Sequence, residues 1–537
     1  MLRGVAQRPP GRQLVRKSVA HYVLTVTMVR ARRSQFIGRL VLLTALSFAL
    51  GAAGCGAEVT VFSGALGGAG AGASGTGAAG AGAAGTGGAG TGGTGNGGSG
   101  AGTAGTAGSC ADDDPGQPWA LRFGDSLRQH AVDVAVDGEC NVVVIGFFAG
   151  NIDFGSGTMS WVGSLPDLFL AKFDPSGSPL WSKAFDQVSQ APQPSLAIDP
   201  ATSTILLAAT AENAIDFGGG TMPAGGQRDV VIAKFDGAGN HLFSKRFGDA
   251  ELQHTYAAVV DGVGNLAITG QFEGTIDFGG GTMTSQGERA SFVARFGPMG
   301  NHLASWSIVG DQHSLMSLSR ADADQVLLGG ILSGPGTLDF GGGQEVSGHA
   351  DACVVRYGPT GMPIFSAIYG DSGPDIQSIR GTTVDSAHDI VLAGVFHGGI
   401  DFGGGPLTTT NEPWAPFVAK LSPAGSPLWS LLLPTGYADG AARRVVAYPS
   451  GDLVVTVIGD WTTDPTTDTV LFGLSPTGEV AWTRAYDGQG AQQVGSMAPG
   501  PNGALYLVGS FDETIAFETG TLTSAGDDDV FLAKVYP

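Results

Sequence analysis

The phrase NIDFGSGTM at residues 151–159 returns in close copies along the chain, and this repetition decides the fold. Five copies share an aspartate followed by Phe-Gly, at Asp153, Asp216, Asp277, Asp339 and Asp401. Their spacings are 63, 61, 62 and 62 residues. Self-similarity at a fixed period is typical of repeat proteins, in which stacked copies of one unit bury a continuous core. The chain is therefore predicted to be a repeat protein.

A second marker keeps the same period. An aromatic residue recurs inside an apolar segment of six units, at Trp119, Trp181, Phe243, Phe365, Trp429 and Trp482. Ala304 occupies this position in the remaining unit. Ala516 takes the aspartate position 115 residues after Asp401, which leaves room for a degenerate copy near Asp460. Seven positions on one register predict seven structural units.

Each unit reads as four short strands. In the third copy these are HTYAAVVD, NLAITGQF, SFVARFG and NHLASWSIVG, at residues 254–261, 265–272, 291–297 and 301–310. β-Branched and aromatic residues dominate them, and the turns DGVGN and GPMGN contain residues that tolerate positive φ. Seven such units predict an all-β, seven-bladed β-propeller with four antiparallel strands per blade.

The two ends of the repeat region predict how the ring closes. The segment at residues 117–125 resembles a fourth strand without its first three, and the segment at 528–537 resembles a third strand without its fourth. Pairing these two strands would complete one blade and cover two exposed edges. We therefore expect the segments around Leu121 and Leu532 to be antiparallel neighbours.

Three stretches resemble a known family. DIVLAGVFHGGIDFGGG at 389–405, FVAKLSPAGSPLWS at 417–430 and AVVDGVGNLAITGQF at 258–272 are similar to the SBBP repeats of secreted bacterial proteins. The resemblance covers about residues 118–537 and implies a seven-bladed β-propeller. It specifies the fold and says little about function. The sixth copy lacks the Asp-Phe-Gly phrase, so its loop is expected to be remodelled.

The repeated phrase has a structural and a metal-binding interpretation. Its aspartates are expected to accept hydrogen bonds from the following glycine amides, as in Asx turns. Its aromatic residues are expected to fill the gaps between neighbouring blades, at Phe154, Phe217, Phe278, Phe340, Phe402 and Phe517. Ca²⁺ is the alternative, because carboxylates in glycine-rich loops suit that ion. Each copy supplies a single carboxylate, however, so the structural interpretation is favoured and no cofactor is expected.

A second recurrence lies in the loops between units. It consists of Gln-His pairs at Gln129 and His130, Gln253 and His254, and Gln312 and His313. Gln377 and Gln492 approximate the glutamine position in later copies. Propeller geometry would place these residues around the mouth of the central channel, as a candidate binding face. The alternatives are loops shaped by duplication, which are favoured, and a metal site if three imidazoles converged.

The N-terminal region carries a predicted export signal. A basic stretch at residues 29–39 precedes an apolar run at 40–50, which is shorter than the ~20 residues that span a bilayer. Small residues then lead into Cys55, and the segment resembles a bacterial lipoprotein signal, although Ala52 stands where such signals usually carry leucine. The resemblance implies cleavage before Cys55 and lipid attachment there. An ordinary secretory signal is the alternative.

These patterns predict the domain organisation. Residues 1–54 form the signal region, in which Met28 is an alternative start, and residues 55–62 form the lipidated N-terminus. Residues 63–109 are a Gly/Ala/Ser/Thr-rich linker that is expected to be disordered, and residues 118–537 form the propeller. Gly56 follows the cysteine instead of a retaining aspartate, which favours the outer membrane or cell surface over the inner membrane.

The remaining cysteines have separate interpretations. Cys110 ends the linker and Cys140 lies in the turn DGECN. Both are expected on the same face of the propeller in an oxidising compartment, so they could form a disulfide, and two free thiols are the alternative. Cys353 lies between apolar residues of a strand and is expected to be a small buried hydrophobe.

Charge and missing motifs limit the function classes. The formal net charge is −21, and residues 1–54 contain nine basic residues and no acid, so the rest holds 18 basic residues against 48 acidic ones. Such a body is expected to repel nucleic acid. The sequence contains no GxSxG, HExxH or CxxC motif. We expect a monomeric lipoprotein scaffold that binds an envelope protein or glycan without catalysis. A hydrolase or lyase with a site at the channel mouth and a purely structural envelope component are the alternatives.

Overall fold

The computed structural model describes residues 116–537 apart from 163–164, 187–193, 286–288, 311, 323, 372, 374, 410–413, 435–439 and 460–468. The predicted signal region, the lipidation site Cys55, the linker and Cys110 lie outside the described residues. So does the loop of the sixth copy that was expected to be remodelled. The predictions for these segments therefore stay predictions.

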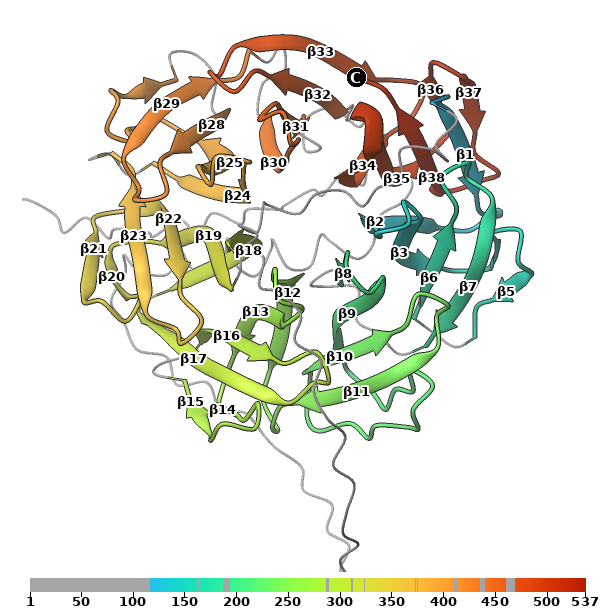
Figure 1. Ribbon diagram of the computed structural model, residues 1–537, viewed down its shortest axis with the longest axis horizontal. Coiled ribbons are helices and arrows are strands. Elements are labelled where there is room, and N and C mark those ends of the chain that lie inside the picture. The colour runs from blue at the N-terminus through green and yellow to red at the C-terminus, as the bar shows by residue number, and fades with distance from the viewer. Residues whose placement is uncertain are drawn as a thin grey trace, which may run out of the picture. The chain divides into compact units, whose positions relative to one another are not determined.

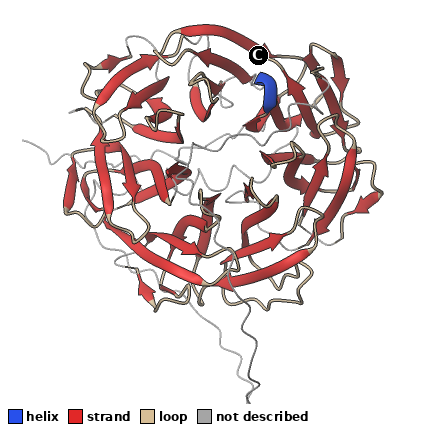
Figure 2. Ribbon diagram, in the orientation of Figure 1, coloured by secondary structure: helices blue, strands red, loops and turns tan. Residues whose placement is uncertain are grey.

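Seven antiparallel blades of four strands each are arranged around one axis, and the sheet of the third blade extends by two further strands (Figure 1). This confirms the predicted seven-bladed β-propeller. Strands make up nearly all of the regular secondary structure of the described residues, and the helical segment described is the three-residue 3-10 turn η1 (Pro501–Gly503) (Figure 2). Within the described residues, no helix has the length and apolar character needed to cross a membrane.

The blades follow one another along the chain, and each runs from an innermost to an outermost strand. The first two blades contain β2 (Gln129–Val136), β3 (Val142–Phe148), β6 (Asp167–Phe173) and β7 (Pro179–Phe185), then β8 (Ser195–Asp199), β9 (Thr204–Ala211), β10 (Asp229–Phe235) and β11 (His241–Phe247). The third and fourth contain β12 (Gln253–Val260), β13 (Leu266–Phe272), β16 (Ala290–Phe296) and β17 (His302–Gly310), then β18 (His313–Asp322), β19 (Gln325–Ser333), β22 (Ala350–Tyr357) and β23 (Pro363–Tyr369).

The remaining three blades keep the same order. The fifth and sixth contain β24 (Gln377–Val384), β25 (Ile390–Phe396), β28 (Ala415–Leu421) and β29 (Pro427–Leu432), then β30 (Ala441–Ala447), β31 (Leu453–Ile458), β32 (Thr469–Leu474) and β33 (Val480–Tyr486). The seventh contains β34 (Gln492–Pro499), β35 (Leu505–Phe511), β38 (Asp529–Val535) and β1 (Trp119–Phe123).

The repeated phrase folds into a small hairpin between the second and third strands of most blades. These hairpins are β4 (Asn151–Asp153) with β5 (Thr158–Ser160), β14 (Thr275–Ile276) with β15 (Met283–Thr284), β20 (Gly336–Asp339) with β21 (Gln344–Ser347), β26 (Gly399–Ile400) with β27 (Leu407–Thr408), and β36 (Thr514–Phe517) with β37 (Gly520–Thr523). In the second blade, one bridge between Ile215 and Met222 takes the place of the hairpin.

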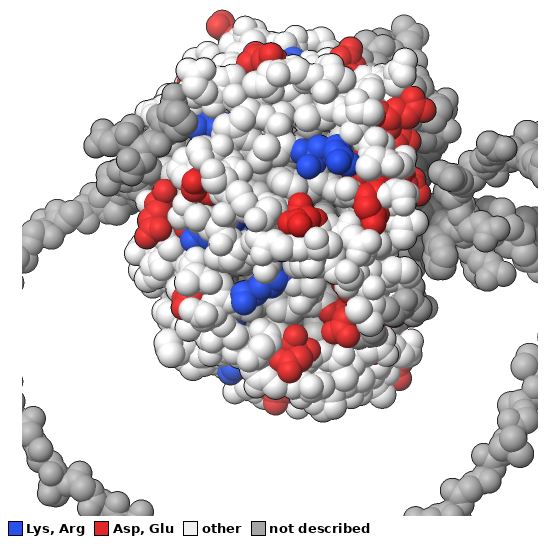
Figure 3. All heavy atoms as spheres, turned by 90° about the vertical axis from the view of Figure 1, so that its right-hand side faces the viewer, with Lys and Arg blue, Asp and Glu red and all other residues white. Residues whose placement is uncertain are grey.

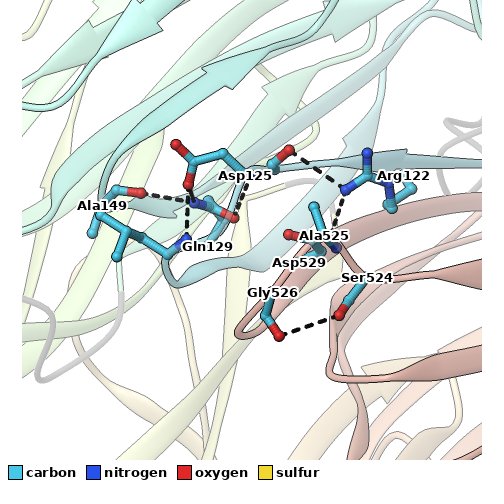
Figure 4. Close-up of polar contacts among 10 residues, drawn as sticks. Arg122, Asp125, Gln129, Ala149, Ser524, Ala525, Gly526 and Asp529 are labelled. Atoms are coloured by element: carbon cyan, nitrogen blue, oxygen red, sulfur yellow. Dashed lines mark hydrogen bonds and ion pairs between the residues drawn. The ribbon is translucent and has the colours of Figure 1, made fainter.

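The ring closes by pairing its first and last strands. β1 lies antiparallel to β38, with Leu121 opposite Leu532, as predicted. The Arg122 Nη1 atom lies 2.5 Å from the Asp529 Oδ2 atom, and this ion pair links the two strands (Figure 4). The pairing leaves neither strand as an open edge on that side, which is the physical advantage of closure.

The core lies between the blades. Every residue of β3, β6, β10 and β28 is buried, because each middle strand packs a neighbouring blade on both of its faces. The outermost strands are more exposed: Leu180, Leu242 and Leu303 remain about half exposed, at 48%, 49% and 48%. A single sheet of this kind would leave both apolar faces in water, so the ring is the unit of stability.

Candidate functional site

The repeated aspartates are used in turn formation. The Asp153 Oδ1 atom accepts hydrogen bonds from the backbone N–H groups of Gly155 at 2.7 Å and Gly157 at 3.3 Å. The Gly155 bond is the main cause that holds the pKa of Asp153 below its usual value. The same pair of bonds is present at Asp216, Asp277, Asp339 and Asp401. Gly155 has φ 97° and Gly157 has φ 122°, conformations that disfavour any other residue.

The phenylalanine after each aspartate packs between two blades. The Phe154 ring lies 4.8 Å from that of Phe123 in the preceding blade and 4.9 Å from that of Phe169 in its own blade. The equivalents Phe217, Phe278, Phe340 and Phe402 are at most 3% exposed. The phrase therefore holds a turn and fills an inter-blade gap. No group of three or more His, Cys, Asp or Glu residues that could hold a metal ion occurs in the described part of the chain.

The glutamines of the predicted binding face are not available to a ligand. Gln129 is fully buried, and its Nε2 atom donates to the Asp125 Oδ1 atom at 2.9 Å and to the Ala149 carbonyl at 2.7 Å (Figure 4). Gln253 is also fully buried and makes the equivalent bonds to Asp249 and to the carbonyl of Glu273. The prediction that these glutamines form a binding face is wrong, because their side chains hold the inter-blade loops together.

The later glutamines follow the same rule. Gln377 is fully buried and donates to the carbonyls of His397 and Gly399, and Gln492 donates to those of Gln489 and Thr514.

The fourth copy departs from the predicted register. His313 pairs with Leu332, just as Gln129 pairs with Phe148 at the start of the first blade. His313 therefore occupies the buried glutamine position, and Gln312 is exposed in the loop that precedes β18. The loop in the fourth blade is shorter, which moves the Gln-His pair by one position. Equating this pair with the other two was wrong.

The two histidines that do share a position are half-buried on innermost strands. Burial lowers the pKa of His130 to about 4, and the charge of Arg128 adds to this effect. Burial also lowers the pKa of His254 to about 4, with smaller effects from Arg289 and Arg228. The His254 Nε2 atom lies 3.1 Å from the Tyr256 hydroxyl. Both imidazoles are therefore neutral at pH 7, and they belong to blades that are not adjacent.

A third recurrence, which the sequence analysis missed, lies on the third strands. These strands carry a cationic residue near their ends, at Lys172, Lys234, Arg295, Arg356, Lys420 and Lys534. All six are buried. The spacing of about 62 residues between the first five was visible in the sequence, but a buried cation is uncommon enough that solvent exposure was the default expectation.

Four of these cations donate to a carbonyl group of the next blade. The Lys172 Nζ atom lies 2.7 Å from the Asp137 Oδ2 atom of its own blade and donates to the Gly237 carbonyl of the next blade at 2.8 Å. Lys420 repeats the arrangement with Asp385 at 2.5 Å and the carbonyl of Pro476 at 3.4 Å. Such a buried pair is sensitive to loss of either partner.

The aromatic residue of the outermost strand completes most of these boundaries. The Trp181 Nε1 atom donates to the Gly237 carbonyl at 3.2 Å, and a Cβ atom on Gly239 would lie 3.0 Å from the Trp181 ring. Glycine is therefore needed in the next blade's turn so that the ring can pack there. Trp119, Phe243, Phe365 and Trp429 lie against the equivalent glycines.

The boundary between the third and fourth blades is different. Ala304 supplies no ring, and Trp306, two residues further along β17, packs against Gly361. β17 also continues to pair with β20, a hairpin strand of the fourth blade, through Val309 and Gly310. Among the described sheets this is the one ladder of several residues that joins two blades, and single bridges, Arg228–Leu252 and Ala350–Ile376, join two other pairs of blades.

A hollow opens at this boundary. It has a volume of about 320 Å³ and is lined by Val263, Asn265, Arg295, Leu303, Asp324 and Pro359. Arg295 is 2% exposed and its Nη2 atom lies 2.5 Å from the Asp261 Oδ2 atom, but its Nε–H group has no hydrogen-bond partner in the described part of the structure. The hollow therefore combines apolar side chains with a guanidinium, a carboxylate and an amide.

On the side that faces the viewer in Figure 3, acidic and basic side chains are interspersed in a largely uncharged surface. The described residues also include two cysteines. Cys140 is disulfide-bonded, and Cys353 is a buried free thiol. Because Cys110 lies outside the described residues, its pairing with Cys140 stays a prediction.

Comparisons with known proteins add little beyond the fold class. No family model and no curated protein sequence matches the chain. The chain is similar to the β-propeller domain of the Trilobed protease from Pyrococcus furiosus, at 8% identity and a TM-score of 0.38, with 76% of this chain and 95% of that chain covered. It is also similar to an acylaminoacyl peptidase from Pyrococcus horikoshii, at 9% identity and a TM-score of 0.37, with 74% and 52% covered.

A glucose dehydrogenase is similar at 13% identity and a TM-score of 0.33, with 66% of this chain and 99% of that chain covered. Likenesses this distant carry no functional argument. The fold therefore rests on the strand pairings described above, and the resemblance to SBBP repeats stays a prediction.

Proposed function

We propose that the protein is a non-catalytic binding scaffold of the cell envelope and that its ligand is a glycan. In this proposal the chain is anchored through a lipid on Cys55, and the propeller presents the hollow between the third and fourth blades. The observation that carries the proposal is the position of this hollow, where Ala304 replaces the aromatic residue of other blades. Its volume of about 320 Å³ lies at the lower end of the range of small-molecule sites.

The lining chemistry favours a sugar ring. Leu303 and Val263 are exposed apolar side chains, which suit the C–H face of a pyranose. The Asp324 carboxylate accepts hydrogen bonds, the Asn265 amide can donate or accept them, and a sugar hydroxyl can do both. An anion is disfavoured because Asp261 already pairs with Arg295 and because Asp324 adds negative charge. The ligand class is therefore a neutral glycan.

A glycan array probed with the full chain tests this proposal. Wild-type protein is expected to retain a defined set of neutral glycans, and Ala304→Trp is expected to lose them because it fills the hollow with the ring that other blades carry. Asp324→Asn should weaken binding about 10-fold by removing a charged acceptor. Leu180→Ala, at an equally exposed leucine of the first blade, is the matched control and should bind normally.

The proposal is overturned if the wild-type protein binds no neutral glycan on the array. It is also overturned if Ala304→Trp binds the same glycans. In the second case the ligand would bind elsewhere on the scaffold. If the wild type captured a specific envelope protein and no glycan, the protein-binding alternative would replace the glycan proposal.

A further inference from the structure

The innermost strands of the propeller share an irregularity that sequence periodicity does not reveal. Six of them contain a β-bulge, in which one residue has no partner on the adjacent strand. The bulged residues are Val132, Tyr256, Met316, Arg380, Arg443 and Gly495. Bulges re-aim a side chain and often occur next to functional sites. Because these strands surround the axis of the ring (Figure 1), the bulges lie in its innermost layer, where Val132 is buried between blades and Arg380 and Arg443 are exposed.

Two neighbouring blades place arginine at this position. Arg380 is the bulged residue of β24 and Arg443 is that of β30, and Arg444 follows directly. The two strands lie close together, since a Cβ atom on Gly381 would lie 3.0 Å from the carbonyl oxygen of Arg443. On the other side, the Arg380 Nη1 atom lies 4.0 Å from the Sδ atom of Met316, the bulged residue of the fourth blade.

The surroundings of these arginines are unusual for an acidic chain. All three are exposed to solvent. Burial nevertheless lowers the pKa of Arg380, and the positive charge of Arg443 lowers it further. Burial likewise lowers the pKa of Arg443, with a further contribution from the charge of Arg444.

No carboxylate neutralises this group within the described residues. Eight of the twelve described arginines form ion pairs with Asp or Glu, whereas the three of this group and Arg320 form none. The contrast is notable in a chain with 48 acidic and 27 basic residues. Three adjacent like charges repel one another, so an arrangement of this kind is stabilised when a counter-charge binds between them.

We infer that Arg380 and Arg443 form a binding site for an oxyanion of the phosphate or sulfate class at the centre of the ring. Guanidinium groups present parallel N–H donors that match the oxygen atoms of these groups, and their charge persists at any physiological pH. Arg444 adds a third positive charge beside the site. This site is separate from the hollow at Ala304, and the two bind ligands of different charge.

Isothermal titration of the full chain in a chloride buffer at constant ionic strength tests this site. Inorganic sulfate and inorganic phosphate are the first probes, and a sulfated disaccharide with its unsulfated parent forms the second arm. We expect one saturable site for the oxyanion. Arg380→Gln and Arg443→Gln should each weaken binding at least about 10-fold, and the double variant should remove it. If the sulfated disaccharide binds tighter than free sulfate, a glycan carries the anion; if not, the free ion is the ligand.

Controls separate the site from general charge effects and from the proposed glycan function. Arg289→Gln removes the same charge from an exposed ion pair with Glu273 and should leave oxyanion binding unchanged. Ala304→Trp should also leave it unchanged. A second readout needs no ligand: Arg443→Gln should raise the Tm at low ionic strength, because it relieves repulsion between like charges.

Two results would overturn the inference. One is a wild-type affinity no higher than that of the double variant, and the other is an equal loss in Arg289→Gln.

Discussion

Two boundaries between blades pack differently. They are the boundary between the first and second blades and the boundary between the third and fourth. At the first, Lys172 and Trp181 both bind the Gly237 carbonyl, and the Trp181 ring covers the turn of the next blade. At the second, Arg295 keeps its pair with Asp261, and Ala304 supplies no ring. Trp306 packs against Gly361 instead, and a hollow remains beside Leu303. Backbone pairing of β17 with β20 also joins the second boundary.

The difference shows how a repeat protein acquires a site. Every blade inherits the same boundary by duplication, so a ligand site equivalent in all blades would be spread around the ring. A ligand site that occurs only once in the ring therefore requires one boundary that differs from the others. Here Ala304 stands where other blades carry the aromatic residue, Trp306 packs against Gly361 from two residues further along β17, and a hollow lies beside Leu303.

The largest effect is expected for a substitution at the boundary between the first and second blades. Lys172→Ala leaves the buried Asp137 carboxylate without its cation and removes the bond to the Gly237 carbonyl, and the loss of one partner of a buried pair costs about 3–5 kcal/mol. Urea unfolding should show this loss. Lys183→Ala on the outermost strand of the same blade is the control and should change the free energy of unfolding by less than about 0.5 kcal/mol. Similar values for the two variants would show that the buried pair adds no stability.

The next largest effect is expected when the boundary between the first and second blades loses its aromatic side chain. Trp181→Ala should open a hollow beside Gly239 and lower the free energy of unfolding by about 2 kcal/mol, because the ring is only half-buried. Urea unfolding measures the loss, and a crystal structure of the variant would show the hollow. Collapse of the turn onto the vacated space would contradict the view that the next blade is held in place without the ring.

The reverse change sharpens the comparison. Ala304→Trp should fill the hollow and raise the free energy of unfolding by about 0.5–2 kcal/mol, as cavity-filling substitutions do. Thermal unfolding in the absence of ligand measures the gain. Ala304→Ser, which adds little volume, serves as the control. A destabilised Ala304→Trp variant would mean that Trp306 and Leu303 already occupy the space that the new ring needs.

The regular part of this architecture was predictable from sequence, because its causes are local. Strand alternation and glycine turns recur within each 62-residue period, and the two half-blades at the ends imply closure at Leu121 and Leu532. The site residues were harder to predict. Gln129 looks like a polar loop residue, and its burial depends on partners brought together by the fold.

Other features leave weaker traces. A bulge such as that at Arg380 adds one residue to a strand and changes no composition, so it carries no sequence signature. In the sequence, the only sign of the hollow is Ala304, which stands where other units carry an aromatic residue. The sequence does not show whether another side chain fills the space. Trp306 fills part of it, which only the structure reveals.

The smallest expected effect tests whether the first and third blades differ away from their outermost strands. His130 and His254 occupy the same position on β2 and β12, and burial lowers the pKa of each to about 4, from an ordinary value of 6.5. Between these values the unfolded chain binds more protons than the folded one. Each histidine therefore contributes stability that is present above pH 6.5 and is lost as the pH falls toward 4.

Replacing either histidine should flatten the pH dependence of stability in that window. The free energy of unfolding of His130→Gln and of His254→Gln, measured in urea at several pH values from 7 to 4.5, should fall less steeply on acidification than that of the wild type. The change in slope is bounded by about 1.4 kcal/mol per pH unit and reduced by partial solvent access. Equal flattening would confine the difference between the blades to their outer strands. If only one of the two variants flattens the pH dependence of the free energy of unfolding, the first and third blades also differ at their innermost strands.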